Sequence, residues 1–298
     1  MAELDHRAEI REFLRSRRAR ITPEQAGLPA YGGNRRVAGL RREEVAMLAG
    51  VSVDYYVRME RGSLSGTSES VLDALARALQ LDDAEQEHLL ALARESNHSA
   101  RSRQRTAMPN SIRPAIQQVL DAITDAPAWV RNGRHDLIAM NPLGRALYAP
   151  VLAVPRRPAN AIRFIYLDPA ARDFFMDWET MARNAAAALR LQAGQTPHDK
   201  ALIELVGELS TQSELFRQHW ASHDVRFHRS GRKRLRHPVV GELDLSYESM
   251  DFPTDPGMRL NVYTAAAGTP AADGLKLLAS WAATEEAAAL TEQPATKN

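Results

Sequence analysis

The sequence predicts an all-α N-terminal domain of five helices and an α+β C-terminal domain built round an antiparallel sheet. Two observations lead to this prediction. Before residue 96, apolar residues recur at helical spacing, without strand-like runs. Beyond residue 113, short β-rich runs joined by turn signals flank a block of helices, with no strand–helix–strand repeat. The chain length of 298 residues also suits two domains.

The composition is that of a folded protein that stays out of membranes. Hydrophobic residues make up 44% of the chain and charged residues 25%, which permits a sizeable core and excludes a disordered or fibrous chain. The absence of cysteine excludes disulfides, iron–sulfur clusters and thiolate metal sites. No apolar run approaches the ~20 residues that span a membrane, and the N-terminal residues lack the apolar core of a secretory signal. We therefore expect a cytoplasmic protein.

The strongest pattern in the chain is RREEVAMLAGVSVDYYVRMERG, at residues 41–62. It predicts two helices round a tight turn. Ala46 lets the helices cross closely, Gly50 suits a turn with φ > 0, and Ser52 can N-cap the second helix. The apolar side of both helices is formed by Val45, Leu48, Val51, Tyr56 and Met59. These are the residue types that a helix-turn-helix needs.

The outward face of the second helix is free to enter a DNA major groove. It carries Val53, Asp54, Tyr55, Val57, Arg58 and Arg61. Residues 7–42 contain ten Arg against three Glu, with no Asp or Lys. Basic charge beside such a motif is the footprint of phosphate contacts, and a solvated basic helix face is the alternative. Arg35 and Arg36, on the irregular loop of residues 26–36, can reach the DNA backbone.

The other helices of the first domain, residues 1–95, follow from apolar periodicity. They are expected at residues 6–19, at residues 68–80 and from residue 82 onward. Thr22-Pro23-Glu24 resembles a further helix start, with Thr as cap and Pro at the first helical position. Residues 96–113 are rich in Ser, Arg, Asn and Pro, which is the composition of a linker.

The second domain, residues 114–283, is expected to combine strands and helices. Turns are predicted at Asn132-Gly133 and Ser230-Gly231. Strands are predicted at residues 128–131, 135–140, 163–167, 225–229, 232–236, 241–249 and 258–263. Helices are predicted before Pro127, after Asn141-Pro142, and at residues 178–191, 198–209, 213–223 and 271–281. Residues 284–298 are expected to form a flexible tail.

The aromatic residues of the second domain can line an apolar pocket with a few polar anchors. Contacts with a small-molecule effector are predicted at Asn141, Tyr148, Phe164, Trp178, His223, Arg226, His237 and Tyr247. Arg226 can hold a carboxylate bidentately, which suits a fatty acid or another small acid. For each aromatic residue the alternative is a place in the core. For the whole domain the alternative is a dimerisation or protein-interaction module without a ligand.

Two further patterns have ordinary explanations. His219 and His223 share a helix face at i, i+4 spacing and can bind a metal with His228 or His237. No supporting ligand pattern accompanies them, so hydrogen-bonded histidines are favoured and neither metal nor cofactor is predicted. The basic run at residues 232–236 fits a half-exposed strand better than a phosphate contact.

Sequence motifs of enzymes are absent. The chain contains no G-x-S-x-G, no G-x-x-x-x-G-K and no G-x-G-x-x-G pattern. Scattered His, Ser and Asp residues form no recognisable catalytic set. No catalytic residue is therefore assigned, and an enzyme fused to a DNA reader remains a remote alternative.

Several segments resemble a known family of regulators. RREEVAMLAGVSVDYYVRMERG and SVLDALARALQLDD are similar to the Xre/Cro-type repressor domain, a fold of five helices. In one bacterial subset the repressor domain is followed by an MmyB-like ligand-binding domain. Four segments of the second half resemble that ligand-binding domain: MNPLGRALY, FIYLDPAARDFFMDWETMARNAAAALR, ELVGELSTQSELFRQHWASHDVRFHRSGRKRLRHPVVGELDLSYE and LNVYTAAAG. The resemblance covers residues 9–278 and implies a PAS-like second domain in a ligand-responsive transcription regulator. Met140 stands where the family commonly has an aromatic residue.

This resemblance places the second helix of the motif in the major groove, so that four of its residues face base edges. They are Val53, Asp54, Val57 and Arg58. Arg58 can bond bidentately to guanine, and Val53 can pack on a thymine methyl. Asp54 either accepts from a cytosine amino group or helps to cap its helix, and Tyr55 can reach bases or phosphate.

Contacts with DNA phosphates are expected at Ser52 and Arg42, which lie at the start of the two helices. Tyr56 is predicted to be core, and Glu60 to pair with an Arg of its own domain. Because one such domain covers little DNA, we expect a homodimer on a palindromic operator in double-stranded DNA, with half-sites ~34–36 Å apart.

Overall fold

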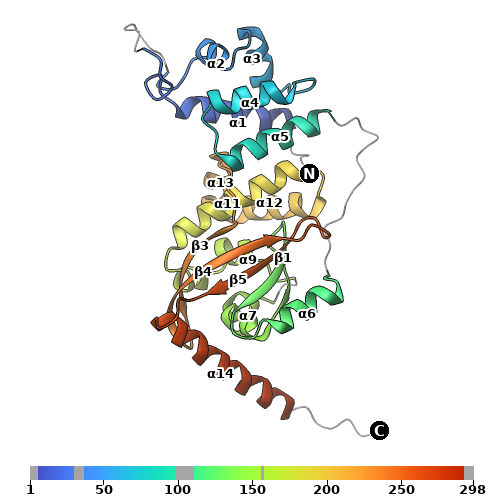
Figure 1. Ribbon diagram of the computed structural model, residues 1–298, viewed down its shortest axis with the longest axis vertical. Coiled ribbons are helices and arrows are strands. Elements are labelled where there is room, and N and C mark those ends of the chain that lie inside the picture. The colour runs from blue at the N-terminus through green and yellow to red at the C-terminus, as the bar shows by residue number, and fades with distance from the viewer. Residues whose placement is uncertain (1–5, 30–36, 98–110, 156–157, 292–298) are drawn as a thin grey trace. The chain divides into compact units, whose positions relative to one another are not determined.

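The computed structural model describes residues 6–29, 37–97, 111–155 and 158–291. Its contacts divide the chain into two compact units (Figure 1). Unit 1 comprises Met1–Thr106, Ala186–Glu208 and Arg217–Phe227, and unit 2 comprises Ala107–Ala185, Leu209–Phe216 and His228–Asn298. Unit 1 therefore contains two segments from the second half of the chain.

The N-terminal part of unit 1 is helical, with five helices as predicted. Their bounds are α1 His6–Arg20, α2 Arg42–Leu48, α3 Val53–Glu60, α4 Glu69–Ala78 and α5 Asp83–Asn97. The helix start predicted at residues 22–24 is wrong, because residues 23–27 form only a turn that Gly27 ends at φ 72°. Thr22 and Gln25 cap each other there through side chain and backbone, without a helix following.

One apolar core holds unit 1 together. Ile10, Phe13 and Leu14 of α1 are fully buried against Tyr56 and Met59 of α3. The same cluster contains two residues from the later segments of unit 1, Leu191 and Val225, and Phe227 packs against it.

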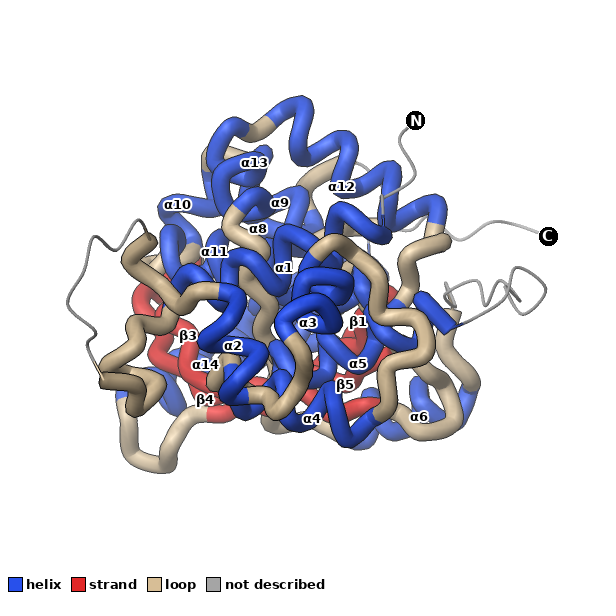
Figure 2. The backbone as a smooth tube through the Cα atoms, turned by 90° about the horizontal axis from the view of Figure 1, so that it is seen from above, coloured by secondary structure: helices blue, strands red, loops and turns tan. Residues whose placement is uncertain are grey.

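The turn between α2 and α3 has the predicted geometry, and the two helices lie next to one another in Figure 2. Gly50 adopts φ 66°, a conformation that other residues rarely adopt without strain. Ala46 is buried at the crossing, as predicted. Leu48 is an exception, because its side chain remains 36% exposed and does not join the core.

Unit 2 is built round a five-stranded antiparallel sheet, which confirms the predicted α+β, PAS-like class. The strands are β1 Ala128–Asn132, β2 Leu137–Met140, β3 Ser230–His237, β4 Gly241–Asp251 and β5 Met258–Thr264. Their order across the sheet is β2-β1-β5-β4-β3. The N-terminal hairpin is thus inserted beside the C-terminal strand, so residues far apart in the sequence share one sheet face.

The described residues from Pro114 onward also form nine helices. Their bounds are α6 Pro114–Ala122, α7 Pro142–Leu147, α8 Ala149–Leu152, α9 Ala161–Leu167, α10 Ala170–Phe174, α11 Trp178–Gln195, α12 Lys200–Gln212, α13 Glu214–Ala221 and α14 Pro270–Thr291. Helix α6 packs on one face of the sheet through Ile116 and Leu120, against Val130 and Leu260. The helices α11 and α13 each begin in unit 2 and continue into unit 1.

Three predictions for the second half are wrong. Residues 163–167 form part of helix α9 and not a strand, because the Asn160 side chain caps the backbone N–H groups of Ile162 and Arg163. Residues 225–229 are not a strand either, since Val225 is buried in the core of unit 1. Ser230 and Gly231 begin β3 and do not form a turn, and Gly231 pairs with Tyr247.

Candidate DNA-reading face and ligand-binding core

Helix α3 presents the outward face that the sequence predicts. Ser52 caps the helix, and its hydroxyl accepts a hydrogen bond from the Tyr55 N–H at 3.1 Å. Tyr56 and Met59 point into the core. On the opposite side Val53 is 44% exposed, and Asp54 and Arg58 are exposed as well. The cap and the buried side chains therefore fix which residues of α3 a duplex can touch.

Two side chains of this face, Arg58 and Tyr55, support one another. The Arg58 guanidinium lies 4.7 Å from the centre of the Tyr55 ring. The Tyr55 hydroxyl reaches the Thr67 hydroxyl at 3.5 Å. Val57 is half-buried beside them. Stacking on Tyr55 reduces the number of orientations open to the Arg58 side chain before it meets a base.

Glu60, the last residue of α3, ties the reading helix to two other helices. Its buried carboxylate pairs with Arg18 Nε of α1 at 2.6 Å and with Arg42 Nε of α2. The Tyr56 hydroxyl donates to the same carboxylate at 3.4 Å. This confirms the prediction that Glu60 pairs within its own domain.

Of the residues predicted to contact phosphate, the structure describes Arg42 and Ser52, and both are exposed. Arg42 is bound to Glu60, yet its side chain is still 54% exposed and can also face a duplex. Ser52 is exposed at the start of α3. Arg35 and Arg36 lie outside the described residues.

The second candidate site is the interior of unit 2, where aromatic rings gather on one face of the sheet, here called the inner face. Trp129 of β1 stacks on Tyr263 of β5 with ring centres 4.6 Å apart, and Tyr247 of β4 stacks on Tyr263 at 5.6 Å. Tyr148 lies 4.2 Å from Trp129, and its hydroxyl is 3.0 Å from that of Tyr263. Burial raises the pKa of Tyr148 and of Tyr263, so both phenols remain neutral.

Two buried cations, which the sequence patterns do not predict as part of the site, lie on the same inner face. Arg131 is 4% exposed and Lys233 is 8% exposed. The Lys233 ammonium lies 4.9 Å from the Tyr247 ring centre and 5.3 Å from that of Tyr263. Within the described part of the chain, neither cation has a carboxylate within 4.0 Å, and Arg131 Nη2 is buried without a hydrogen bond.

Burial is the largest cause of the lowered pKa of each of these groups, and neighbouring cations lower it further. Burial lowers the pKa of Lys233 to about 7, with Arg131 contributing by repulsion. Burial likewise lowers the pKa of Arg131 to about 9, helped by the nearby Arg259. His135, at φ 65° in the turn after β1, has a pKa well below its ordinary value, for burial and for repulsion from Arg131. An anion at this place would be stabilised by the charges of Arg131 and Lys233.

Two of the polar side chains predicted to contact a ligand have structural roles. Asn141 caps α7 by accepting from Gly144 N at 2.7 Å, and its amide also bonds backbone groups at both ends of the preceding turn. His237 has both ring nitrogens in use, one 3.0 Å from the Ala146 carbonyl and one accepting from Val239 N at 3.2 Å. Neither side chain has capacity left for a ligand.

The other predicted ligand residues fall into two groups. Tyr148, Phe164 and Tyr247 are buried in unit 2, and Phe164 packs edge-on against Phe174 and Phe175. Trp178, half-buried there, donates from Nε1 to the Ile165 carbonyl at 2.8 Å. The second group is His223 and Arg226, which belong to unit 1, so the structure does not bring them to the inner face.

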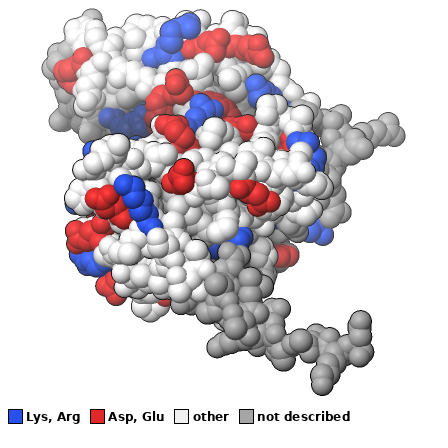
Figure 3. All heavy atoms as spheres, turned by 60° about the horizontal axis from the view of Figure 1, so that its bottom comes forward, with Lys and Arg blue, Asp and Glu red and all other residues white. Residues whose placement is uncertain are grey.

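An open groove of about 700 Å³ lies along the opposite face of β3 and β4. Its charged side chains already neutralise one another, since Arg232 pairs with Asp244 and Arg234 with Asp177. Acidic and basic side chains lie beside one another over the face that Figure 3 shows. The groove therefore offers an anion no unpaired charge, in contrast to the inner face.

Groups that would indicate other chemistry are not found in the described ranges. No set of three His, Asp or Glu side chains is arranged there to hold a metal ion. No helix among them is both long enough and apolar enough to cross a membrane.

Matches to protein families agree with this division of roles. A model described as a helix-turn-helix domain matches residues 9–89, and the model of the MmyB-like transcription regulator ligand binding domain matches residues 112–278. No curated protein matches the chain. The fold and its two faces thus define a DNA-binding transcription regulator with a ligand-sensing domain. The chain belongs to the family of MmyB-like transcription regulators.

Proposed function

We propose that this protein is a sequence-specific, cytoplasmic transcription regulator whose second domain binds a small amphipathic acid, such as a fatty acid. The carboxylate is held by Arg131 and Lys233, here called the cationic pair, and the aromatic rings around Tyr263 contact the apolar part. This replaces Arg226 as the carboxylate anchor. In this proposal the protein has no catalytic activity and binds two partners, DNA and the acid.

The observation that carries this proposal is the burial of two cations without a counter-charge. Removing a charge from water costs several kcal/mol unless an opposite charge compensates it. Such a cost is expected where a ligand supplies the missing charge. A carboxylate fits, because the Arg131 guanidinium can bind it through two N–H groups and Lys233 can add a third donor.

Native mass spectrometry of the purified full-length protein tests the ligand directly. The expected spectrum contains a co-purifying acid or, after incubation with dodecanoate, one dodecanoate per chain. Methyl dodecanoate, which has the same chain without the carboxylate charge, is the matched control and should not bind. A protein that remains free of both compounds would favour an interaction module in place of a ligand-binding domain.

Replacement of Lys233 separates ligand binding from stability. Lys233→Met removes an unneutralised buried charge, so the ligand-free protein is expected to gain about 1–4 kcal/mol in free energy of unfolding while losing dodecanoate affinity. Urea unfolding and calorimetric titration measure the two quantities. Lys276→Met, at an exposed lysine of α14, is the control and should change neither. A lower free energy of unfolding for Lys233→Met would contradict the inference that the buried Lys233 charge has no partner in the ligand-free protein.

On the DNA side we propose a homodimer that binds a palindromic operator through α3 of each copy. A single helix-turn-helix covers few base pairs, and two copies with half-sites ~34–36 Å apart give usual operator affinities. Light scattering on the free and DNA-bound protein tests this. A monomer in both states would contradict it.

Arg58 is the residue of α3 expected to read a base, through two N–H groups on a guanine. After selection of an operator from random duplexes, Arg58→Ala should lose about 1–3 kcal/mol of discrimination at one position. Arg58→Lys keeps the charge but not the paired donors, so it should lose the same discrimination while keeping the dependence on salt. Equal loss on all sequences for Arg58→Ala would instead indicate a phosphate contact.

A further inference from the structure

Unit 1 contains a set of contacts that the DNA-reading and ligand-binding faces do not use. They join α1 and α5 to two segments of the matched ligand-binding domain. One segment is the part of α11 from Ala186 onward. The other is Arg217–Phe227, here called the strap. The contacts that these two segments make with α1 and α5 are together called the clasp.

The first part of the clasp is apolar and close-packed. Leu191 of α11 and Val225 of the strap are 4% and 5% exposed and share one core with Phe13 of α1. Gly194 of α11 lies so near His88 of α5 that a Cβ atom at Gly194 would stand 2.5 Å from the His88 ring. Only a residue without a side chain permits this approach.

The second part is an ion pair between α11 and the start of α1. Arg190, 2% exposed, donates from Nη1 to both carboxylate oxygens of Glu9, at 2.6 and 2.5 Å, and its guanidinium lies 4.0 Å from the Trp220 ring centre. His88 Nε2 and His223 Nδ1 are 3.5 and 3.6 Å from the same carboxylate. Burial raises the pKa of Glu9, but these three neighbours outweigh it and hold that pKa far below its ordinary value.

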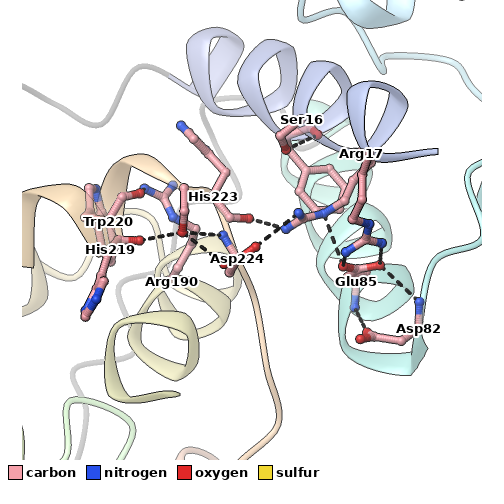
Figure 4. Close-up of polar contacts among 12 residues, drawn as sticks. Ser16, Arg17, Asp82, Glu85, Arg190, His219, Trp220, His223 and Asp224 are labelled. Atoms are coloured by element: carbon pink, nitrogen blue, oxygen red, sulfur yellow. Dashed lines mark hydrogen bonds and ion pairs between the residues drawn. The ribbon is translucent and has the colours of Figure 1, made fainter. Parts of the chain in front are cut away.

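The third part binds the strap to the last turn of α1, as Figure 4 shows. Arg17 is 2% exposed and pairs with Glu85 of α5 and with Asp224 of the strap, each at 3.3 Å. The Arg17 guanidinium also donates to the backbone carbonyl of His223, and His223 adopts a φ of 55°. That φ is unusual for a residue other than glycine and is expected only where surrounding contacts hold it.

The clasp is linked at both ends to functional residues. Arg17 adjoins Arg18, which binds the Glu60 carboxylate at the end of the recognition helix. The strap ends at Phe227, and β3, which carries Lys233, begins at Ser230. Helix α11 is continuous with its first turns in unit 2. Covalent connection and buried contacts therefore form one route from the cationic pair to α3.

We propose that the clasp is a coupling device: it holds α1 behind the recognition helix, and a ligand in the second domain changes DNA affinity by tightening or loosening it. This inference rests on the proposed function for the nature of the signal, but the clasp itself requires no ligand. A population shift of this kind needs an element whose state both sites can bias. The strap is such an element, since it contacts α1 and leads into β3.

Hydrogen–deuterium exchange of the full-length protein tests the clasp without a ligand. Gly194→Ala places a methyl group against His88, and Asp224→Asn removes one charge from Arg17. Both should accelerate amide exchange in α1 and α3 about tenfold. Gly207→Ala, at a helical glycine of α12 with open space around it, and Asp244→Asn, at an exposed ion pair of unit 2, are matched controls and should leave exchange there unchanged.

The other possible results of the exchange experiment also test the clasp. Unchanged exchange of α1 and α3 in both variants would overturn the clasp, as would equal acceleration in β4 and β5, which would indicate general destabilisation. A second arm adds dodecanoate: it should alter exchange in α3 of the wild type and leave Asp224→Asn unresponsive. If dodecanoate fails to bind the wild type, the proposed ligand is wrong, and the ligand-free arm alone still decides the clasp.

Discussion

Glu60→Ala is expected to destabilise unit 1 by about 3–5 kcal/mol, because it removes the shared partner of two arginines from a buried position. Glu60 is 2% exposed. Arg18, only 13% exposed, would keep its charge with no carboxylate beside it.

Urea unfolding followed by far-UV circular dichroism measures the effect as an earlier transition of unit 1. Glu43→Ala is the matched control, since Glu43 is 63% exposed and its contact with Arg41 is 3.7 Å long. Exposed pairs of this kind contribute about 0–1 kcal/mol. Equal shifts for the two variants would show that the Glu60 carboxylate does not hold α1, α2 and α3 together. DNA affinity should fall in parallel with stability, because α3 loses its anchor at one end.

Local patterns in the sequence were sufficient to predict the helix-turn-helix and its outward face. Ser52 as cap, Gly50 at the turn and the outward position of Arg58 all follow from residue types at fixed spacing within about twenty residues. Leu48 was the exception. Its spacing fits the apolar side, but α2 ends there, so no further turn covers its side chain.

The cationic pair could not be predicted, because its members approach through pairing of distant strands. Arg131 and Lys233 are about a hundred residues apart, and only the insertion of β1 beside β5 places them on one sheet face. One signal was present in the sequence. Alternation along residues 232–236 makes Lys233 face inward whenever Arg232 and Arg234 face outward. A lysine at an inward position of a strand is unusual enough to be examined for a partner.

The clasp shows a second limit of local patterns. Residues 225–229 have the composition of a strand, yet Val225 is used to complete a core whose other members lie near the N-terminus. Periodicity describes which side of an element is apolar, and it does not say which part of the chain covers that side. The sequence predicts ligand contacts at His223 and Arg226 for the same reason: both lie in the matched ligand-binding domain but fold with unit 1.

The affinity of a carboxylate ligand is expected to fall steeply as pH rises above 7. In the ligand-free protein the pKa of Lys233 is about 7, so this side chain loses its proton in that range. A carboxylate binds the protonated ammonium, and binding above pH 7 therefore requires proton uptake. Proton linkage then lowers the affinity by up to about tenfold per pH unit, and by about 50-fold between pH 7, where half of the side chain is already deprotonated, and pH 9. Tyr148 and Tyr263 stay neutral across this window, because burial raises the pKa of each phenol.

The stability of the ligand-free protein should change in the opposite direction over the same window. The folded-state pKa of Lys233 lies below its unfolded value, so between pH 7 and pH 9 the unfolded chain binds the extra proton and stability rises with pH. Calorimetric titration with dodecanoate and urea unfolding at pH 7, 8 and 9 measure the two trends. Lys233→Met should flatten both, while Lys276→Met should flatten neither. A dodecanoate affinity independent of pH in the wild type would mean that Lys233 does not meet the carboxylate.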